Sequence, residues 1–84
     1  MTKEEIRALL LKTKDQEHTE FSFSLKKRNM LTGFIVQAGD YRHLNAKNYW
    51  HILTPDRKEA WESTRNINLL LLFPGDAFSK MVML

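Results

Sequence analysis

The chain has 84 residues and a formal charge of +3, from 13 lysines and arginines against 10 aspartates and glutamates. This length allows one small domain, residues 1–84, and the absence of cysteine excludes disulfide support. No apolar run approaches the roughly 18 residues of a membrane span, and Met1 to Arg7 lacks the apolar region of a secretion signal. We therefore expect a cytoplasmic protein that makes no membrane contact.

The first predicted element is a helix from Lys3 to Lys12. Thr2 and Glu5 have the T-x-x-E spacing of a capping box, in which each side chain bonds the backbone N–H of the other residue. Three apolar side chains then recur at the i, i+3, i+4 spacing of one helix face, namely Ile6, Leu9 and Leu10.

The next segment, Glu20 to Lys26, alternates strictly between apolar and polar residues, as a half-buried strand does. Its apolar face would carry Phe21, Phe23 and Leu25. The polar residues from Lys26 to Asn29 then predict a turn with a basic tip.

A second strand is predicted from Met30 to Ala38, and Gly33 inside it indicates a bend or a close backbone approach. Leu44 to Leu53 reads as a third, aromatic-rich strand. The residues from Thr54 to Glu62 fit either a hairpin turn or a capped short helix. Large aromatics of small domains usually pack rather than bind ligand, so Tyr49, Trp50 and Trp61 are expected in the core or at a subunit interface.

Two more strands complete the predicted order. Ile67 to Phe73 is apolar apart from Asn68, Pro74 to Asp76 stops it, and Ala77 to Leu84 forms the last strand. One helix followed by five short-linked strands predicts a small, strongly bent antiparallel barrel capped by the helix.

The segment from Leu25 to Leu44 resembles the first motif of the Sm and Sm-like proteins, a family that includes bacterial Hfq. In that motif an apolar strand, a polar turn and a glycine-containing strand lead to an aspartate, and Gly33 and Asp40 have the matching spacing. Phe73 to Phe78 (Phe-Pro-Gly-Asp-Ala-Phe) is similar to the second motif. The chain departs from the family pattern at three positions, where Arg28, His43 and Pro74 replace glycine, asparagine and a basic residue.

This resemblance implies an SH3-like barrel that assembles into a homo-oligomeric ring. Family members pair the fourth strand of one subunit with the fifth strand of the next, which here means Ile67 to Phe73 with Ala77 to Leu84. Single-stranded RNA then lies around the pore, held by the loops of both motifs. By position, Tyr41 would stack on a base, His43 would hydrogen-bond it, and Gly75 belongs to the loop of the second motif.

The residues around Tyr41 also carry an RNA-binding pattern of their own. Stacking aromatics combined with basic groups hold single-stranded nucleic acid with little sequence preference. Arg42 and Lys47 would add attraction for phosphates. The alternative is an ordinary turn in which Tyr41 folds onto the core.

No activated nucleophile, glycine-rich phosphate loop or histidine cluster occurs in the sequence, so we expect no enzyme activity, cofactor or metal. The leading hypothesis is a non-enzymatic Sm-like ring that binds single-stranded RNA at its pore. The alternative is a ring-forming structural or protein-interaction module that has lost RNA binding, which Pro74 favours.

Overall fold

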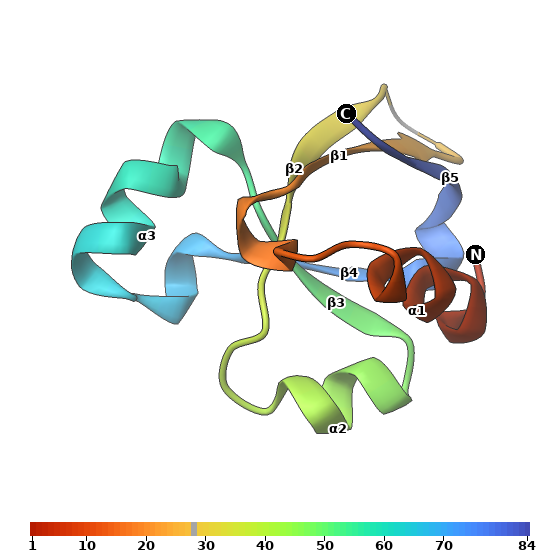
Figure 1. Ribbon diagram of the computed structural model, residues 1–84, viewed down its shortest axis with the longest axis horizontal. Helices are drawn as coiled ribbons and strands as arrows, with labels where there is room; N and C mark the ends of the chain where they lie inside the picture. The colour runs from red at the N-terminus through yellow and green to blue at the C-terminus, as the bar shows by residue number, and fades with distance from the viewer. Residues whose placement is uncertain (28) are drawn as a thin grey trace.

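The computed structural model spans residues 1–84 and describes all of them except residue 28. Among the described residues, 3₁₀ turns at Gln16–His18, Pro55–Arg57, Ile67–Leu69 and Gly75–Ala77 join the main elements (Figure 1). In chain order, these main elements are α1 (Lys3–Leu11), β1 (Glu20–Leu25), β2 (Leu31–Ile35), α2 (Tyr41–Ala46), β3 (Tyr49–Leu53), α3 (Lys58–Thr64), β4 (Leu71–Pro74) and β5 (Phe78–Met83).

Helix α1 confirms the predicted helix to within one residue, and its start confirms the capping box. The Thr2 backbone N–H donates to Glu5 Oε1 over 2.9 Å, and the Glu5 N–H donates to Thr2 Oγ1 over 3.2 Å. Ile6 and Leu10 are buried under the helix, as the spacing predicted.

In the part of the chain that the structure describes, five strands form one antiparallel sheet in the order β4-β3-β2-β1-β5. Strand β1 pairs with β2, where Phe21 lies opposite Gly33, and with β5, where Phe23 lies opposite Met81. This arrangement confirms a mainly β domain with an N-terminal helix. Within one chain the sheet stays open, because β4 and β5 form its two ends and do not pair with each other.

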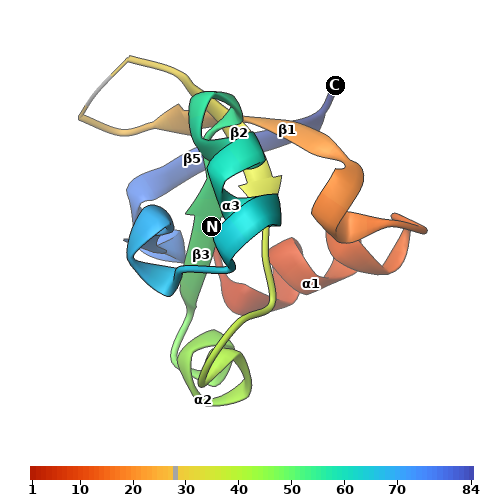
Figure 2. The same ribbon diagram turned by 90° about the vertical axis from the view of Figure 1, so that its left-hand side faces the viewer.

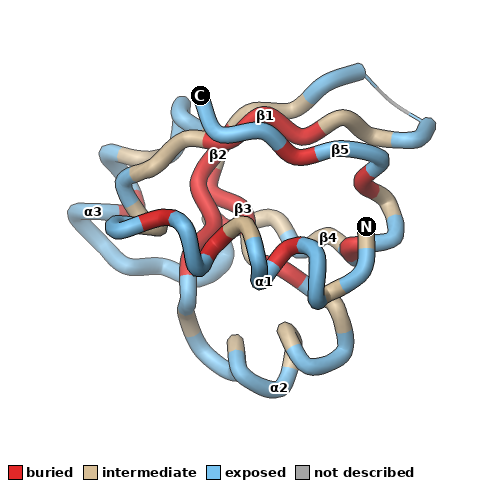
Figure 3. The backbone as a smooth tube through the Cα atoms, turned by 45° about the vertical axis from the view of Figure 1, so that its right-hand side comes forward, coloured by how far each residue is buried: buried red, intermediate tan, exposed pale blue. Residues whose placement is uncertain are grey.

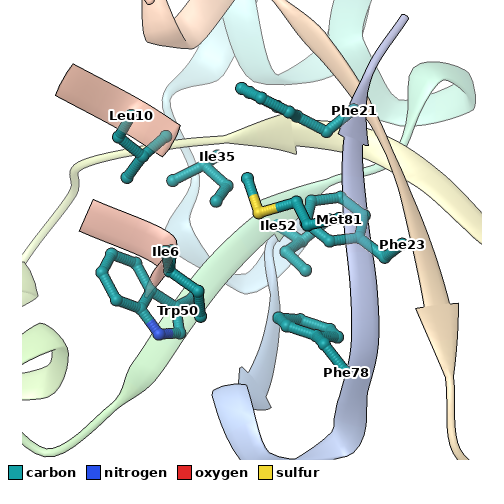
Figure 4. Close-up of a cluster of buried hydrophobic side chains, with 9 residues drawn as sticks. All are labelled: Ile6, Leu10, Phe21, Phe23, Ile35, Trp50, Ile52, Phe78 and Met81. Carbon is teal, nitrogen blue, oxygen red and sulfur yellow. The ribbon is translucent and has the colours of Figure 1, made fainter. Parts of the chain in front are cut away.

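Opposite faces of the sheet carry separate hydrophobic clusters, since side chains alternate along each strand. Figures 1 and 2 show α1 on one side of the sheet, α3 on the other, and α2 next to the start of β3. Figure 4 shows the α1 cluster, which consists of Ile6, Leu10, Phe21, Phe23, Ile35, Trp50, Ile52, Phe78 and Met81. The α3 cluster consists of Phe34, Val36, Leu53, Trp61 and Leu70.

Burial follows these two clusters, and the buried segments run through the sheet and the inner side of α1 (Figure 3). Trp50 and Trp61 are 1% and 4% exposed, which confirms the core prediction for both, whereas Tyr49 is 40% exposed. Gly33 makes the predicted close approach, because a Cβ there would lie 2.7 Å from the Leu53 carbonyl oxygen.

The predicted third strand was wrong in its first half, because the chain forms α2 before β3 begins. Helix α2 ends where Asn48 takes the left-handed conformation, with φ of 66°, a role that asparagine tolerates at helix ends. The Asn45 side-chain nitrogen, in the orientation that satisfies its neighbours, donates to the Tyr41 and Tyr49 carbonyl oxygens over 3.2 and 2.8 Å. That side chain therefore ties the helix to the start of β3.

The predicted fourth strand was wrong at its beginning, where Ile67–Leu69 is a 3₁₀ turn. The Asn66 side-chain oxygen accepts the Asn68 N–H over 3.0 Å and so turns the backbone before β4. Of the two alternatives for residues 54–62, the short helix is correct, since Pro55 opens a 3₁₀ turn that leads into α3. The prediction for Arg28 in the basic turn lies outside the described residues.

Among the described residues, no helix combines the length and apolar character required to cross a bilayer.

Candidate nucleic-acid interface

Helix α2 and its C-terminal cap carry four of the five predicted RNA-binding residues. The chain breaks after β2 at Gly39, whose φ is +58°, and the Leu44 N–H then donates to the Asp40 carbonyl oxygen over 3.0 Å to start the helix. Tyr41, Arg42 and His43 form its first turn, and Lys47 is its C-terminal cap. These residues therefore lie on a short helix and not on the loop that the sequence predicted.

Tyr41 and Arg42 form a contact pair at the start of α2. The Arg42 guanidinium carbon lies 5.9 Å from the centre of the Tyr41 ring, and Arg42 Nε donates to the Tyr41 hydroxyl over 3.4 Å. Tyr41 is half-buried and Arg42 is exposed. An aromatic ring beside a guanidinium offers both stacking and cation–π contacts to a base.

His43 and Tyr41 lie on opposite sides of this helix, because residues two apart differ by about 200° around the axis. His43 is exposed, and Lys47, one turn later, is exposed as well. The exposed residues Arg42, His43 and Lys47 are called the α2 surface below. Tyr41 is half-buried on the opposite side of the helix, which separates the predicted stacking residue from the predicted hydrogen-bonding residue.

Gly75 is buried behind the end of α2 and not exposed beside it. Its N–H donates to the Asn48 carbonyl oxygen over 2.7 Å, and its own carbonyl accepts the Met1 amino group over 2.9 Å. Both polar groups of Gly75 are therefore bonded within the chain. The fold thus places Gly75, the glycine of the second motif, next to the end of α2. It packs there against Asn48, and its bonded N–H and carbonyl are not free to bind a ligand.

Asn48 is the residue in this region that the sequence reasoning missed. Its side-chain oxygen accepts the Trp50 indole N–H over 2.9 Å, and its side-chain nitrogen donates to the Met1 carbonyl over 3.0 Å. An asparagine followed at once by an aromatic strand was the available signal, since asparagine is one of the few residues that tolerates the left-handed region.

Helix α1 lies beside α2 and completes this part of the molecule. The Lys3 ammonium donates to the Ala46 carbonyl oxygen at the end of α2 over 3.1 Å. Between the two helices lies a groove of about 310 Å³, lined by Tyr41 and Arg42 on one side and by Arg7 on the other. Arg7 was not among the predicted binding residues, because only the folded chain brings residue 7 near residue 42.

Among the described residues, no three His, Asp or Glu side chains lie close enough together to hold a metal ion. His51 is the histidine closest to the core, and burial lowers the pKa of its imidazole, so it is neutral at physiological pH. It is half-buried in β3, opposite Leu72 of β4.

Comparisons of the chain with protein-family models, with curated proteins and with solved structures find no match.

Proposed function

We propose that this chain is a non-enzymatic Sm-like protein whose copies join edge to edge into a homo-oligomeric ring that binds single-stranded RNA. The observation that carries this proposal is the strand order. The open ends of the sheet are β4 and β5, the two strands that the sequence resemblance pairs between neighbouring subunits. A neighbour's β5 added to β4 would continue the sheet from one copy to the next.

The side chains of the two end strands support this pairing. Leu72 of β4 is 48% exposed, and Val82 and Met83 of β5 are 42% and 43% exposed. Apolar side chains on unpaired edge strands are a recognised template for pairing with another chain. A closed ring uses every such edge, because each copy offers one β4 and one β5.

RNA binding rests on the α2 surface. Arg42 and Lys47 are exposed there with His43, and a ring repeats this cationic surface once per copy. Each cation that neutralises a phosphate releases counterions, so even two cations per copy become a strong attraction in an assembly. A formal charge of +3 per chain therefore has more consequence for a ring than for a monomer.

The test is a salt titration of binding to short U-rich and A-rich single-stranded RNA, with the native mass of the protein measured in parallel. We expect a closed oligomer that binds at low salt and loses affinity as salt rises. A Tyr41→Ala, Arg42→Ala double variant should keep the native mass and lose most of the affinity. No binding at low salt, or unchanged binding by the double variant, would remove the proposed RNA site.

A second candidate function is a ring-forming protein-interaction module without RNA binding. Pro74 favours it, because an exposed proline stands at the end of β4 where the family has a basic residue. The bonded backbone of Gly75 points the same way, since it offers no free N–H to a ligand. A closed oligomer that ignores RNA in the same titration would select this candidate.

A further inference from the structure

The groove between α1 and α2 has the composition of a small-ligand site. Its walls come from two helices and from β3, and it lies between segments that are far apart in the sequence. A volume of about 310 Å³ is at the lower end of the range of ligand pockets, which suits one compact molecule and not a length of folded chain.

The charges of the groove select an anion. Arg7 of α1 and Arg42 of α2 are the charged residues of its lining, and no carboxylate lines it among the described residues. Arg7 is exposed and forms no ion pair with a described residue, so its guanidinium is available to a ligand. Guanidinium groups bind phosphate through two parallel hydrogen bonds, which makes phosphate the anion that best fits this pair.

The uncharged lining selects a flat, partly apolar body attached to that anion. Tyr41 supplies an aromatic ring and Leu11, which is 86% exposed, supplies an apolar wall on α1. An aromatic ring next to a cation is the arrangement on which nucleobases stack.

The groove also has hydrogen-bonding groups. Gln37 is exposed and lines it with a side-chain amide, which has both donors and acceptors. The edge of a nucleobase can bond such an amide through its own donors and acceptors.

We infer that the groove binds one nucleotide of the single-stranded RNA, with Tyr41 against the base and with Arg7 and Arg42 on its phosphate. This inference rests on the proposed RNA-binding function and adds α1 to it. Arg7 is the residue that distinguishes the groove from the α2 surface. The site lies between two helices, so RNA would follow the α1–α2 side of each copy.

The test measures binding of adenosine 5′-monophosphate, uridine 5′-monophosphate and inorganic phosphate to the assembled protein by calorimetry, with RNA competition as a second arm. Arg7→Ala should weaken mononucleotide binding by about tenfold, because it removes a charge-assisted contact. Lys12→Ala is the matched control, since it removes an exposed cation of the same helix region that does not line the groove, and it should change affinity less than about twofold.

Mononucleotide binding that depends on Arg7 and that short RNA competes away supports the groove. Equal effects of the two variants, phosphate binding as tight as mononucleotide binding, or no competition by RNA would each overturn it. A ring that binds RNA but no mononucleotide removes the groove and leaves the proposed function intact. Absence of both a ring and RNA binding removes the proposed function itself, and with it the assignment of the groove to a nucleotide of RNA.

Discussion

Asn48 and Gly75 hold the end of α2 against the turn between β4 and β5. The Gly75 N–H donates to the Asn48 carbonyl oxygen over 2.7 Å, and a Cβ on residue 75 would overlap the Asn48 side-chain amide. The second family-like motif therefore meets the residues that follow α2 through a contact that a side chain at position 75 would crowd. A position that the sequence assigned to RNA binding has a packing role in the chain.

Replacing Gly75 with alanine should lower the free energy of unfolding by about 1–3 kcal/mol, the usual cost of overpacking a tight site. Urea denaturation followed by tryptophan fluorescence measures the change. The matched control is the same substitution in an Asn48→Gly background, where the overlapping amide is gone and the left-handed backbone is retained. Equal losses in both backgrounds would show that the Asn48 amide is not the cause.

Glu17 should give the fold a pH dependence below neutrality. Its Oε1 accepts the Trp61 indole N–H over 3.1 Å and lies 2.5 Å from Arg65 Nη1. These contacts lower the pKa of the carboxyl group from its ordinary value of 4.5, and the bond from the indole has the largest effect. A carboxyl group whose pKa is lower in the folded state stabilises the fold at pH values above its ordinary, unfolded-state pKa. This stabilisation is lost as the pH falls through the lower, folded-state pKa. Denaturation midpoints should therefore fall as the pH drops below about 5.

The substitution Glu17→Gln isolates this contribution. It should cost about 0.5–1 kcal/mol of unfolding free energy at pH 7, a modest value because the carboxyl is partly exposed. At a pH below the lowered pKa, the variant and the parent protein should converge. Glu62→Gln, on the exposed side of α3, is the control and should change neither value. A constant difference between Glu17→Gln and the parent at both pH values would rule out titration of Glu17.

A charge on the free edge of β4 should prevent assembly without unfolding the chain. Leu72→Lys places a cation where a neighbour's strand would pair, which is how natural edge strands avoid association. Leu72 is 48% exposed, so the unfolding free energy should change by less than about 0.5 kcal/mol. Analytical ultracentrifugation should find a smaller species for Leu72→Lys, while Leu11→Lys on α1 keeps the parent mass. An unchanged mass for Leu72→Lys would place the interface elsewhere.

The α2 surface should contribute to the salt dependence of RNA binding. Removing one phosphate contact from single-stranded RNA reduces the slope of log affinity against log salt by about 0.7. We expect that reduction for Lys47→Ala, measured by fluorescence anisotropy with a labelled short RNA. Lys14→Ala, an exposed cation beyond the end of α1, should leave the slope unchanged. Parallel slopes for all three proteins would mean that Lys47 contacts no phosphate.

Much of the fold could be predicted because its signals are local. The capping box of Thr2 and Glu5 located α1, and strict alternation located β1 with Phe21 and Phe23 inside. Gly33 marked a close approach of two strands, which the Leu53 carbonyl confirms. Each of these patterns depends on neighbours within a few residues.

The errors occurred where one side chain redirects the backbone. Asn66 bonds the Asn68 N–H and turns an apolar run into a 3₁₀ turn before β4, so hydrophobicity alone predicted too long a strand. Helix α2 has six residues and no apolar repeat, and the Asn45 side chain bonds its first residue, Tyr41, and the first residue of β3, Tyr49. A short helix held by such bonds has no periodicity to detect.

The candidate site was predictable only in part for a related reason. Tyr41, Arg42, His43 and Lys47 stand close together in the sequence, so composition and motif position were enough to select them. Arg7 joins them only because α1 packs beside α2, where Lys3 bonds Ala46. A partner more than thirty residues away gives no local signal.

Native mass spectrometry of the full chain, with and without a short single-stranded RNA, tests the edge-to-edge ring most directly. Pairing of β4 with a neighbour's β5 predicts one closed species whose mass is a whole multiple of the 9.9 kDa chain, and RNA should add its own mass to that species. A monomer at every concentration would contradict the proposal, because β4 and β5 would then have no partner.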